Sequence, residues 1–318
     1  MKREEIVAKL QQNDSTLLSF PDRNNEWGDN KYRGNCSGWI HAFLIWKYQV
    51  QKMAELFSGS GTGYDVAKDM GISYVGADLN LNPMRPGILN VNAITDDVPL
   101  EFLGADMIFM HPPYGAEIKI PYAGSMYADP TKELSQYDLG QMPWDTFMKT
   151  LNQIVMKYYA SMESGSRMAI LMGDVRRGGF HSMLTDIVKP GSLEQIIIKA
   201  QHNCVSNGRH YSNRNFVPLV HEYIMVLKKM SPYMLDFQIP MKKALDIRDS
   251  ISATWRDVVM AVISKLGSCS LSQIYAEIEG HKKCENNQNW KAKVRQVLQM
   301  LRDLGLVISK SRGNWVAV

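Results

Sequence analysis

A histidine, two prolines and a tyrosine, His111-Pro112-Pro113-Tyr114, follow an apolar run over 105–110 that predicts a strand. Consecutive prolines fix the direction of the backbone, because each ring locks φ. A neutral imidazole accepts a hydrogen bond through one nitrogen, and a tyrosine ring offers a flat apolar face. Together these groups suit the binding of a flat, nitrogen-bearing ring at the end of that strand.

A glycine loop precedes this motif in the chain. Residues 52–57 predict a strand, and glycines at 59 and 61 follow it directly. Glycine lets the backbone pass close to a ligand. Asp78 ends the next predicted strand, where a carboxylate can accept hydrogen bonds from both hydroxyls of a ribose. The two strand ends therefore indicate a nucleotide-like cofactor.

These motifs resemble those of the amino-methyltransferases, which transfer a methyl group from S-adenosylmethionine to an exocyclic amine of a nucleic-acid base. The pattern acidic-x-Phe-x-Gly-x-Gly covers residues 55–61, and the Pro-Pro-Tyr motif follows it. The resemblance implies an α/β fold, a Rossmann-like class I methyltransferase sheet with helices on both faces. It also implies S-adenosyl-L-methionine as the cofactor.

The resemblance assigns the cofactor to residues on both sides of the glycine loop. Phe57 and Gly59 would contact its amino-acid end, Asp78 its ribose and Asn92 its adenine. The segment 33–40 resembles the segment that lines the methionine pocket in this family. The expected cofactor-binding residues are Asn35, Cys36, Ser37, Glu55, Phe57, Gly59, Gly61, Asp78 and Asn92.

The same resemblance makes His111, Pro112, Pro113 and Tyr114 the catalytic residues. An exocyclic amine is a weak nucleophile, so a site must orient it and accept a hydrogen bond from its N–H. His111 would be one acceptor, the carbonyl of Pro112 the second, and Tyr114 the stacking face. A protonated imidazole cannot accept, so we expect the rate to fall at acidic pH.

His111 is a departure from the family, in which aspartate or asparagine is usual for adenine and serine for cytosine N4. The expected reaction is methylation of adenine N6 in DNA, with cytosine N4 and RNA bases as alternatives. A DNA-binding regulator with a vestigial methyltransferase domain is an alternative of a different class. A base inside a duplex must be flipped out to reach such a pocket.

Strand and helix patterns alternate around these motifs. Expected strands cover 52–57, 73–78, 88–92, 106–110, 167–174, 193–198 and 221–228, and expected helices cover 4–12, 39–48, 65–70 and 144–161. Such alternation predicts a largely parallel sheet covered on both faces. We therefore expect a catalytic domain over 1–230.

The pattern changes beyond a linker expected over 231–250. Helices are predicted over 255–266, 271–278 and 289–304, followed by a hairpin of 306–310 and 315–318. This order is typical of a winged helix-turn-helix domain, over 251–318. Its last part resembles the winged-helix reader at the end of Dam-replacing-type restriction endonucleases, through Trp290, Val294, Leu298, Leu301 and Gly305. A winged helix that mediates dimerisation is the alternative.

Charge is distributed unevenly along the chain. Residues 241–318 hold 13 Lys/Arg against 7 Asp/Glu, a net +6, whereas the preceding residues carry a net −2. A basic segment favours phosphate as its partner. The expected nucleic-acid-binding residues are Arg176, Arg177, Arg209, Arg214, Lys291, Lys293, Arg295 and Arg312. The expected partner is duplex DNA with one base flipped, and a cognate restriction enzyme is left open as a second.

Composition excludes several other classes. The four cysteines form no C-x-x-C pair, so no metal site is expected. Scattered thiols suit a reducing compartment, and no apolar run approaches the length of a membrane span. We therefore expect a cytoplasmic protein, with its oligomeric state undetermined.

Overall fold

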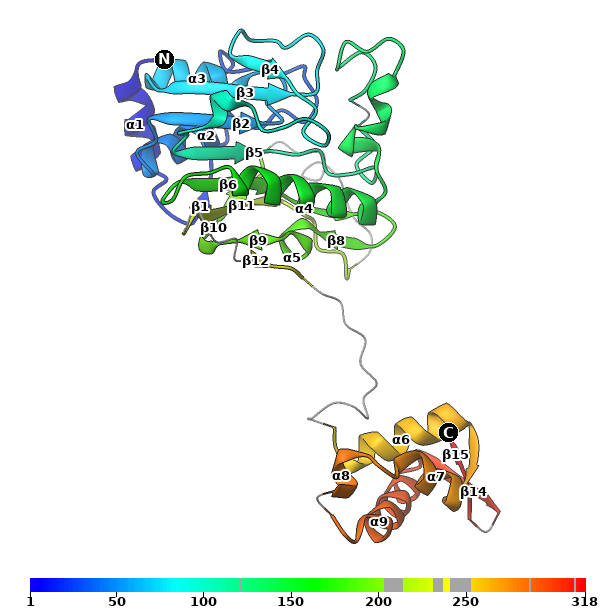
Figure 1. The fold of residues 1–318 in the computed structure, drawn as a ribbon. Coiled ribbons are helices and arrows are strands. Elements are labelled where there is room, and N and C mark those ends of the chain that lie inside the picture. The colour runs from blue at the N-terminus through cyan, green and yellow to red at the C-terminus, as the bar shows by residue number, and fades with distance from the viewer. Residues whose placement is uncertain (121, 203–213, 231–236, 241–252, 286, 312) are drawn as a thin grey trace. The chain divides into compact units, whose positions relative to one another are not determined.

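The computed structural model describes the chain except residues 121, 203–213, 231–236, 241–252, 286 and 312. It divides into two compact units, Met1–Pro240 and Met241–Val318 (Figure 1). Within the segment expected as a linker, strand β12 (Phe237–Gln238) pairs with β9 (Lys189–Pro190). The first unit therefore extends beyond the domain end expected at residue 230.

The first unit is built on a sheet whose described strands run in the order β1-β10-β11-β6-β5-β2-β3-β4. Neighbours from β6 to β4 are parallel, whereas β11 is antiparallel to both β6 and β10. The strands are β1 (Leu17–Leu18), β2 (Lys52–Leu56), β3 (Ser73–Asp78), β4 (Ile88–Asn90), β5 (Met107–Met110), β6 (Arg167–Met172), β10 (Ser192–Ala200) and β11 (His221–Lys228). The predicted Rossmann-like α/β sheet, which is parallel from β6 to β4, is confirmed.

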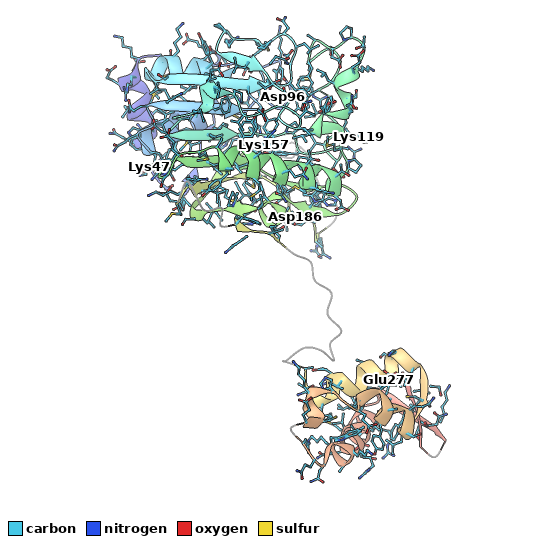
Figure 2. All side chains as sticks on the ribbon, in the orientation of Figure 1. Lys47, Asp96, Lys119, Lys157, Asp186 and Glu277 are labelled. Carbon is cyan, nitrogen blue, oxygen red and sulfur yellow. The ribbon has the colours of Figure 1, made fainter. Side chains whose placement is uncertain are left out.

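Helices cover both faces of this sheet (Figure 1). One face packs against α1 (Arg3–Gln11), α2 (Gly38–Lys47) and α3 (Thr62–Met70), and the other against α4 (Trp144–Ala160). In β5, Phe109 packs on the face that α1, α2 and α3 cover, and Ile108 packs on the face that α4 covers. Burial on both sides explains the unbroken apolar run of this strand. Lys157 of α4 also donates to the Asp96 carbonyl at 2.6 Å (Figure 2).

The strand register places three chain segments at one edge. Leu56 at the end of β2 pairs with Ala77 of β3 on one side and with Met110 of β5 on the other. The glycine loop, Asp78 and the His111 motif therefore leave the sheet at the same level. From β2 the chain continues to β3 on one side of the sheet, and from β5 it continues to β6 on the other side. Such a switch point opens a crevice at the carboxyl ends of the strands.

Several short elements lie outside the predicted pattern. The strand expected over 167–174 ends at Met172, as β6. Asp174 instead begins a hairpin of β7 (Asp174–Arg176) and β8 (Phe180–Ser182). The others in this unit are the 3₁₀ turns η1 (Leu100–Phe102), η2 (Glu133–Gln136) and η3 (Leu139–Gln141), and the short helix α5 (Met183–Asp186). They are too short to leave a periodic signal in the sequence.

The second unit has its own core and the order of a winged helix. Its elements are α6 (Trp255–Leu266), β13 (Ser268–Ser270), α7 (Leu271–Ile278), α8 (Lys282–Glu285), α9 (Trp290–Asp303), β14 (Val307–Ser311) and β15 (Asn314–Ala317). Reciprocal capping boxes begin α6 at Thr254 and α7 at Ser270. The predicted hairpin forms, and the short β13 adds a third strand to it.

We predict that residues 1–240 fold when they are produced alone. Both layers of apolar packing around the large sheet are made within this segment, so its folding needs no residue of the second unit. Circular dichroism should show a mixed helix and strand spectrum with one cooperative thermal transition. A truncated chain that lacks such a transition would contradict the division at this point.

Candidate functional site

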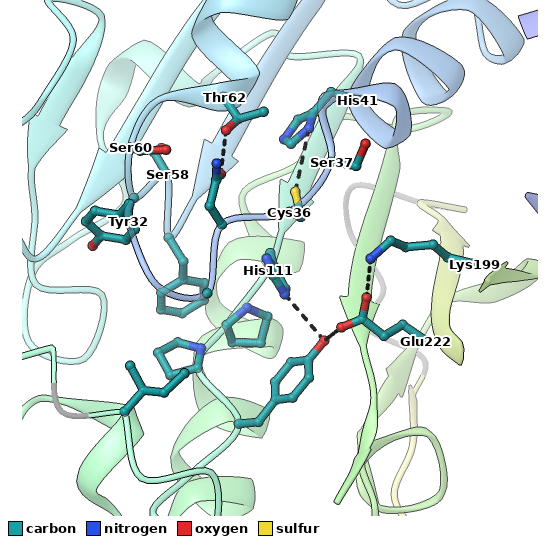
Figure 3. A pocket seen from close by; sticks show the side chains of 18 of the residues that line it. Tyr32, Cys36, Ser37, His41, Ser58, Ser60, Thr62, His111, Lys199 and Glu222 are labelled. Atoms are coloured by element: carbon teal, nitrogen blue, oxygen red, sulfur yellow. Dashed lines mark hydrogen bonds and ion pairs between the residues drawn. The ribbon is translucent and has the colours of Figure 1, made fainter. Parts of the chain in front are cut away.

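A cavity of about 750 Å³ opens at the carboxyl ends of β2, β3 and β5 (Figure 3). It is lined by residues from both predicted motifs and by the segment that precedes α2. The predicted residues on its wall are Asn35, Cys36, Ser37, Glu55, Phe57, Gly59, Asp78, His111, Pro112, Pro113 and Tyr114. Residues from three distant parts of the chain thus meet in one place. Two of the predicted residues, Gly61 and Asn92, are not part of the lining.

The glycine loop is anchored by the carboxylate of Asp78. Its Oδ2 accepts from the Gly59 backbone N–H at 2.8 Å, and its Oδ1 accepts from that of Asn80 at 2.9 Å. Burial raises the pKa of Asp78, against these backbone hydrogen bonds. Phe57 lies in the left-handed region, with φ of 65°, which is uncommon for a residue with a side chain and is typical of functional sites.

Gly61 and Asn92 have roles in the local structure. Gly61 is the N-cap of α3 with φ of 82°, and a side chain there would collide with Arg85. The Oδ1 of Asn92 accepts from the Ile94 backbone N–H at 3.0 Å, which closes a turn. Asn92 lines a small neighbouring cavity that shares Asp78 with the large one.

The segment before α2 forms another part of the wall. Asn35 donates to the carbonyl of Asp29 at 3.2 Å and accepts from the hydroxyl of Thr62 at 2.5 Å, which ties this segment to the start of α3. The hydroxyl of Ser37 is buried and has no hydrogen-bond partner among the described residues. Since buried polar atoms are normally paired, Ser37 offers a bond to a ligand.

Glu55 is buried and both of its carboxylate oxygens are already engaged. His41 Nε2 lies 2.7 Å from Oε1, and the hydroxyl of Tyr74 donates to Oε2. The Nδ1 atom of the same imidazole lies 3.9 Å from Cys36 Sγ. Glu55 therefore acts on His41 and Cys36 more directly than on a ligand. No signal in the sequence pointed to His41, which lies within a continuous apolar helix.

The tyrosine of the Pro-Pro-Tyr motif is held by a second buried carboxylate. The Tyr114 hydroxyl donates to Glu222 Oε1 at 2.9 Å, and Lys199 pairs with the other oxygen (Figure 3). Burial alone would raise the pKa of Glu222, but the charges of Lys199 and His111 and the hydrogen bonds to Lys199 and Tyr114 lower it to about 2. Burial and the Glu222 charge raise the pKa of Tyr114, which stays a neutral phenol.

This chain of contacts determines which nitrogen of His111 can accept. Ionised Glu222 only accepts, so the single proton of the Tyr114 hydroxyl points to it. The hydroxyl oxygen, 3.3 Å from His111 Nε2, must then accept from an N–H at that nitrogen. In the neutral imidazole Nδ1 is consequently the acceptor. Glu222 lies on β11 and Lys199 on β10. The sequence signal that could have identified Glu222 is its charge within the apolar pattern of 221–228.

The basic residues predicted for the first unit have partners of their own. Arg176 donates to the Val217 carbonyl at 2.6 Å and lies over the rings of Phe180 and Phe216. Arg177 is exposed and donates to the Glu117 carbonyl at 3.4 Å. Arg214 is exposed as well. Arg209 and Arg312 lie outside the described residues.

The remaining three basic residues lie on the first turns of α9 in the second unit. Lys291 and Arg295 are exposed and Lys293 is half-buried. Arg295 donates to the hydroxyl of Tyr275 at 2.9 Å, and Lys293 donates to Gln296 at 2.9 Å. Their charges add to the positive end of the helix dipole, so this end of α9 favours an anion.

The described residues lack a metal-binding cluster and a membrane-spanning helix. No group of three or more histidine, cysteine, aspartate or glutamate side chains there could hold a metal ion. Within the same residues, helices that combine the length and the apolarity of a membrane span are absent.

The comparisons with known proteins bear mainly on the second unit. Residues 251–316 match the family model of the Dam-replacing HTH domain, and no curated protein sequence matches the chain. TrmN from Thermus thermophilus has 17% identity and a TM-score of 0.39, over 62% of this chain and 50% of its own. A SAM-dependent methyltransferase from Archaeoglobus fulgidus has 13% identity and a TM-score of 0.34, over 60% and 93%. A candidate DNA modification methylase, also from Thermus thermophilus, has 17% and 0.24, over 45% and 49%. The chain thus spans about half of the length of TrmN, and its winged-helix segment is similar to the Dam-replacing HTH family.

Proposed function

We propose that this protein is a DNA methyltransferase that transfers a methyl group from S-adenosylmethionine to an exocyclic amine of a base, adenine N6. One observation carries the proposal: a single cavity at the switch point of a Rossmann-like sheet unites the glycine loop and Asp78 with His111 and Tyr114. The groups proposed to bind the cofactor and those proposed to bind the base therefore face one cavity.

The cofactor side of the cavity fits a ligand with a ribose and an amino-acid end. Asp78 would hold the ribose hydroxyls, and the backbone at Phe57 and Gly59 would approach the amino-acid end. The unpaired hydroxyl of Ser37 supplies a further hydrogen bond. When bound, S-adenosylmethionine supplies an electrophilic methyl group on a sulfonium.

The opposite side would hold the base. His111 Nδ1 accepts a hydrogen bond from the amine, the carbonyl of Pro112 accepts the second, and the ring of Tyr114 stacks on the base. A Cβ at Gly173 would lie 3.0 Å from the Tyr114 ring, so one side of this ring is closed by the backbone. Since Glu222 anchors its hydroxyl, the stacking face is fixed before the base enters. Positioning of this kind can supply several kcal/mol.

DNA is supported as the acceptor by the second unit. Its match to the Dam-replacing HTH domain, its net charge of +6 and the basic first turns of α9 agree with phosphate binding. The target base must leave the duplex to reach the cavity. A restriction enzyme of the same specificity is a further proposed partner, on the resemblance of this winged helix alone.

The direct test is mass analysis of nucleosides from duplex DNA incubated with the protein and isotopically labelled cofactor. N6-methyladenine supports the proposal. N4-methylcytosine as the product would move the acceptor to cytosine, and label in RNA alone would exclude DNA. Cofactor binding without transfer to any nucleic acid would favour a DNA-binding regulator.

Asp78→Ala should weaken binding of S-adenosylmethionine. The change removes the carboxylate proposed for the ribose and the anchor of the glycine loop, at a cost of roughly 1.5–3 kcal/mol, or about 10- to 150-fold in Kd. Isothermal calorimetry measures the effect. Asp97→Ala, at an exposed carboxylate outside the cavity lining, is the matched control. Equal affinity of the two variants would remove Asp78 from the site.

His111→Ala and Tyr114→Ala should each abolish most methyl transfer and leave the affinity for the cofactor within about threefold. Both residues lie on the base side of the cavity, so their loss affects the orientation of the amine. Single-turnover assays and calorimetry separate the two effects. His181→Ala, which lies outside the lining, should retain transfer. Near-normal turnover of His111→Ala would disprove its role as acceptor.

Replacing Lys291, Lys293 and Arg295 by alanine should reduce DNA affinity and flatten its dependence on salt. Each lost phosphate contact lowers the slope of log K against log salt by about one. Fluorescence anisotropy at several salt concentrations measures it. Arg302→Ala, at the opposite end of α9, is the control. An unchanged slope in the triple variant would move DNA binding to the first unit.

A further inference from the structure

Cys36 is a cavity residue whose surroundings are those of a nucleophile. Its side chain lines the cavity with a relative exposure of 7%. Cys36 Sγ lies 3.9 Å from His41 Nδ1, and Nε2 of the same imidazole lies 2.7 Å from Glu55 Oε1. A thiol, an imidazole and a carboxylate in this order are the arrangement that activates a sulfur nucleophile.

The buried carboxylate determines the charge of the whole group. Glu55 receives hydrogen bonds on both oxygens, from His41 and from Tyr74, and an ionised carboxylate can accept both. A buried carboxylate needs an opposite charge nearby, and His41 is the group that can supply it. Protonated His41 then donates from Nδ1 to the sulfur of Cys36, which favours the thiolate.

We propose that Cys36 is a methyl-accepting nucleophile, modified to S-methylcysteine by the sulfonium cofactor when no base occupies the cavity. This inference rests on the proposed function for the identity of the methyl donor. In the step, Cys36 Sγ bonds to the methyl carbon while the bond from that carbon to the sulfonium sulfur breaks. The electron pair of the broken bond stays on the departing sulfur, which yields S-adenosylhomocysteine. The thiolate carries no proton, and His41 keeps its own.

The charges that face Cys36 agree with a thiolate. Burial alone would raise the pKa of this thiol, but its interactions with His41, whose charge has the larger effect, and with His111 lower it to about 6. Burial would likewise lower the pKa of His41, but the charges of Glu55 and Cys36 raise it to about 10. In contrast, burial raises the pKa of the thiols at Cys269 and Cys284.

The position of Cys36 beside His111 links the thiolate to the methyl group. The side chains of Cys36 and His111 lie next to each other on the wall of the cavity (Figure 3). The amine that His111 is proposed to hold must receive the methyl group next to this imidazole. A methyl donor placed for that amine is therefore also close to Cys36 Sγ. An empty base pocket leaves the thiolate as the neighbouring nucleophile, and a bound base should shield it.

The first experiment uses the whole protein without cofactor. Alkylation of Cys36 by iodoacetamide, followed by peptide mass spectrometry between pH 5 and 9, should show a rate midpoint below pH 7. An ordinary thiol has its midpoint at about pH 8.5. His41→Gln removes the cation and should raise the midpoint by more than one pH unit. The thermal transition of the variant shows whether it folds. If it does not, the pH dependence of the alkylation rate in the protein without substitutions still tests for the thiolate. A midpoint above pH 8 in that protein overturns the proposal.

The second experiment supplies methyl-labelled S-adenosylmethionine without DNA. We expect one methyl group per chain on the peptide that contains Cys36, none in Cys36→Ser, and normal labelling in Cys284→Ser. Duplex DNA that contains an acceptor base should reduce the labelling at least severalfold. Calorimetry on the same samples separates the two hypotheses. Cofactor binding without label on Cys36 overturns this inference and leaves the proposed function standing, whereas absence of binding overturns both.

Discussion

The parallel pairing of β2 with β3 on one side and β5 on the other is the constraint on which the site depends. Leu56 is level with both Ala77 and Met110, so the residues that follow each strand leave the sheet together. The loop after β2 and the loop after β5 lead to opposite sides of the switch point, and the space between them becomes the cavity. A shift of register in either pair would separate the glycine loop from the proline motif.

Two buried carboxylates then orient other side chains on the cavity wall. An isolated buried charge is costly, so each carboxylate needs a partner: His41 for Glu55 and Lys199 for Glu222. Each pair also positions a third group, Cys36 in one case and Tyr114 in the other. The same requirement to neutralise buried charge therefore organises both the thiol and the His111 imidazole.

The two units divide the chemical properties of the chain. The first buries apolar side chains on both faces of its sheet and carries a slight excess of negative charge. The second is a small core with a net charge of +6. Long-range attraction to a polyanion thus comes from the second unit, and the cavity comes from the first.

Features that depend on near neighbours in the chain could be predicted from the amino-acid pattern alone. Apolar runs marked β2, β3, β5 and β6, and the glycines marked the loop after β2. The family resemblance led to Asp78 and to the residues from His111 to Tyr114, all of which line the cavity. These signals are local because backbone conformation and capping are decided within a few residues.

Only the tertiary structure decided which distant side chains meet. Tyr114 and Glu222 are 108 positions apart, and nothing in either local pattern indicates the other. The engagement of Glu55 by His41 and Tyr74, and the turn that takes up the Asn92 side chain, were equally hidden. Periodicity shows which face of an element is buried but not what packs on it. The partners of a buried polar group are determined by strand order and register, which the whole chain sets at once.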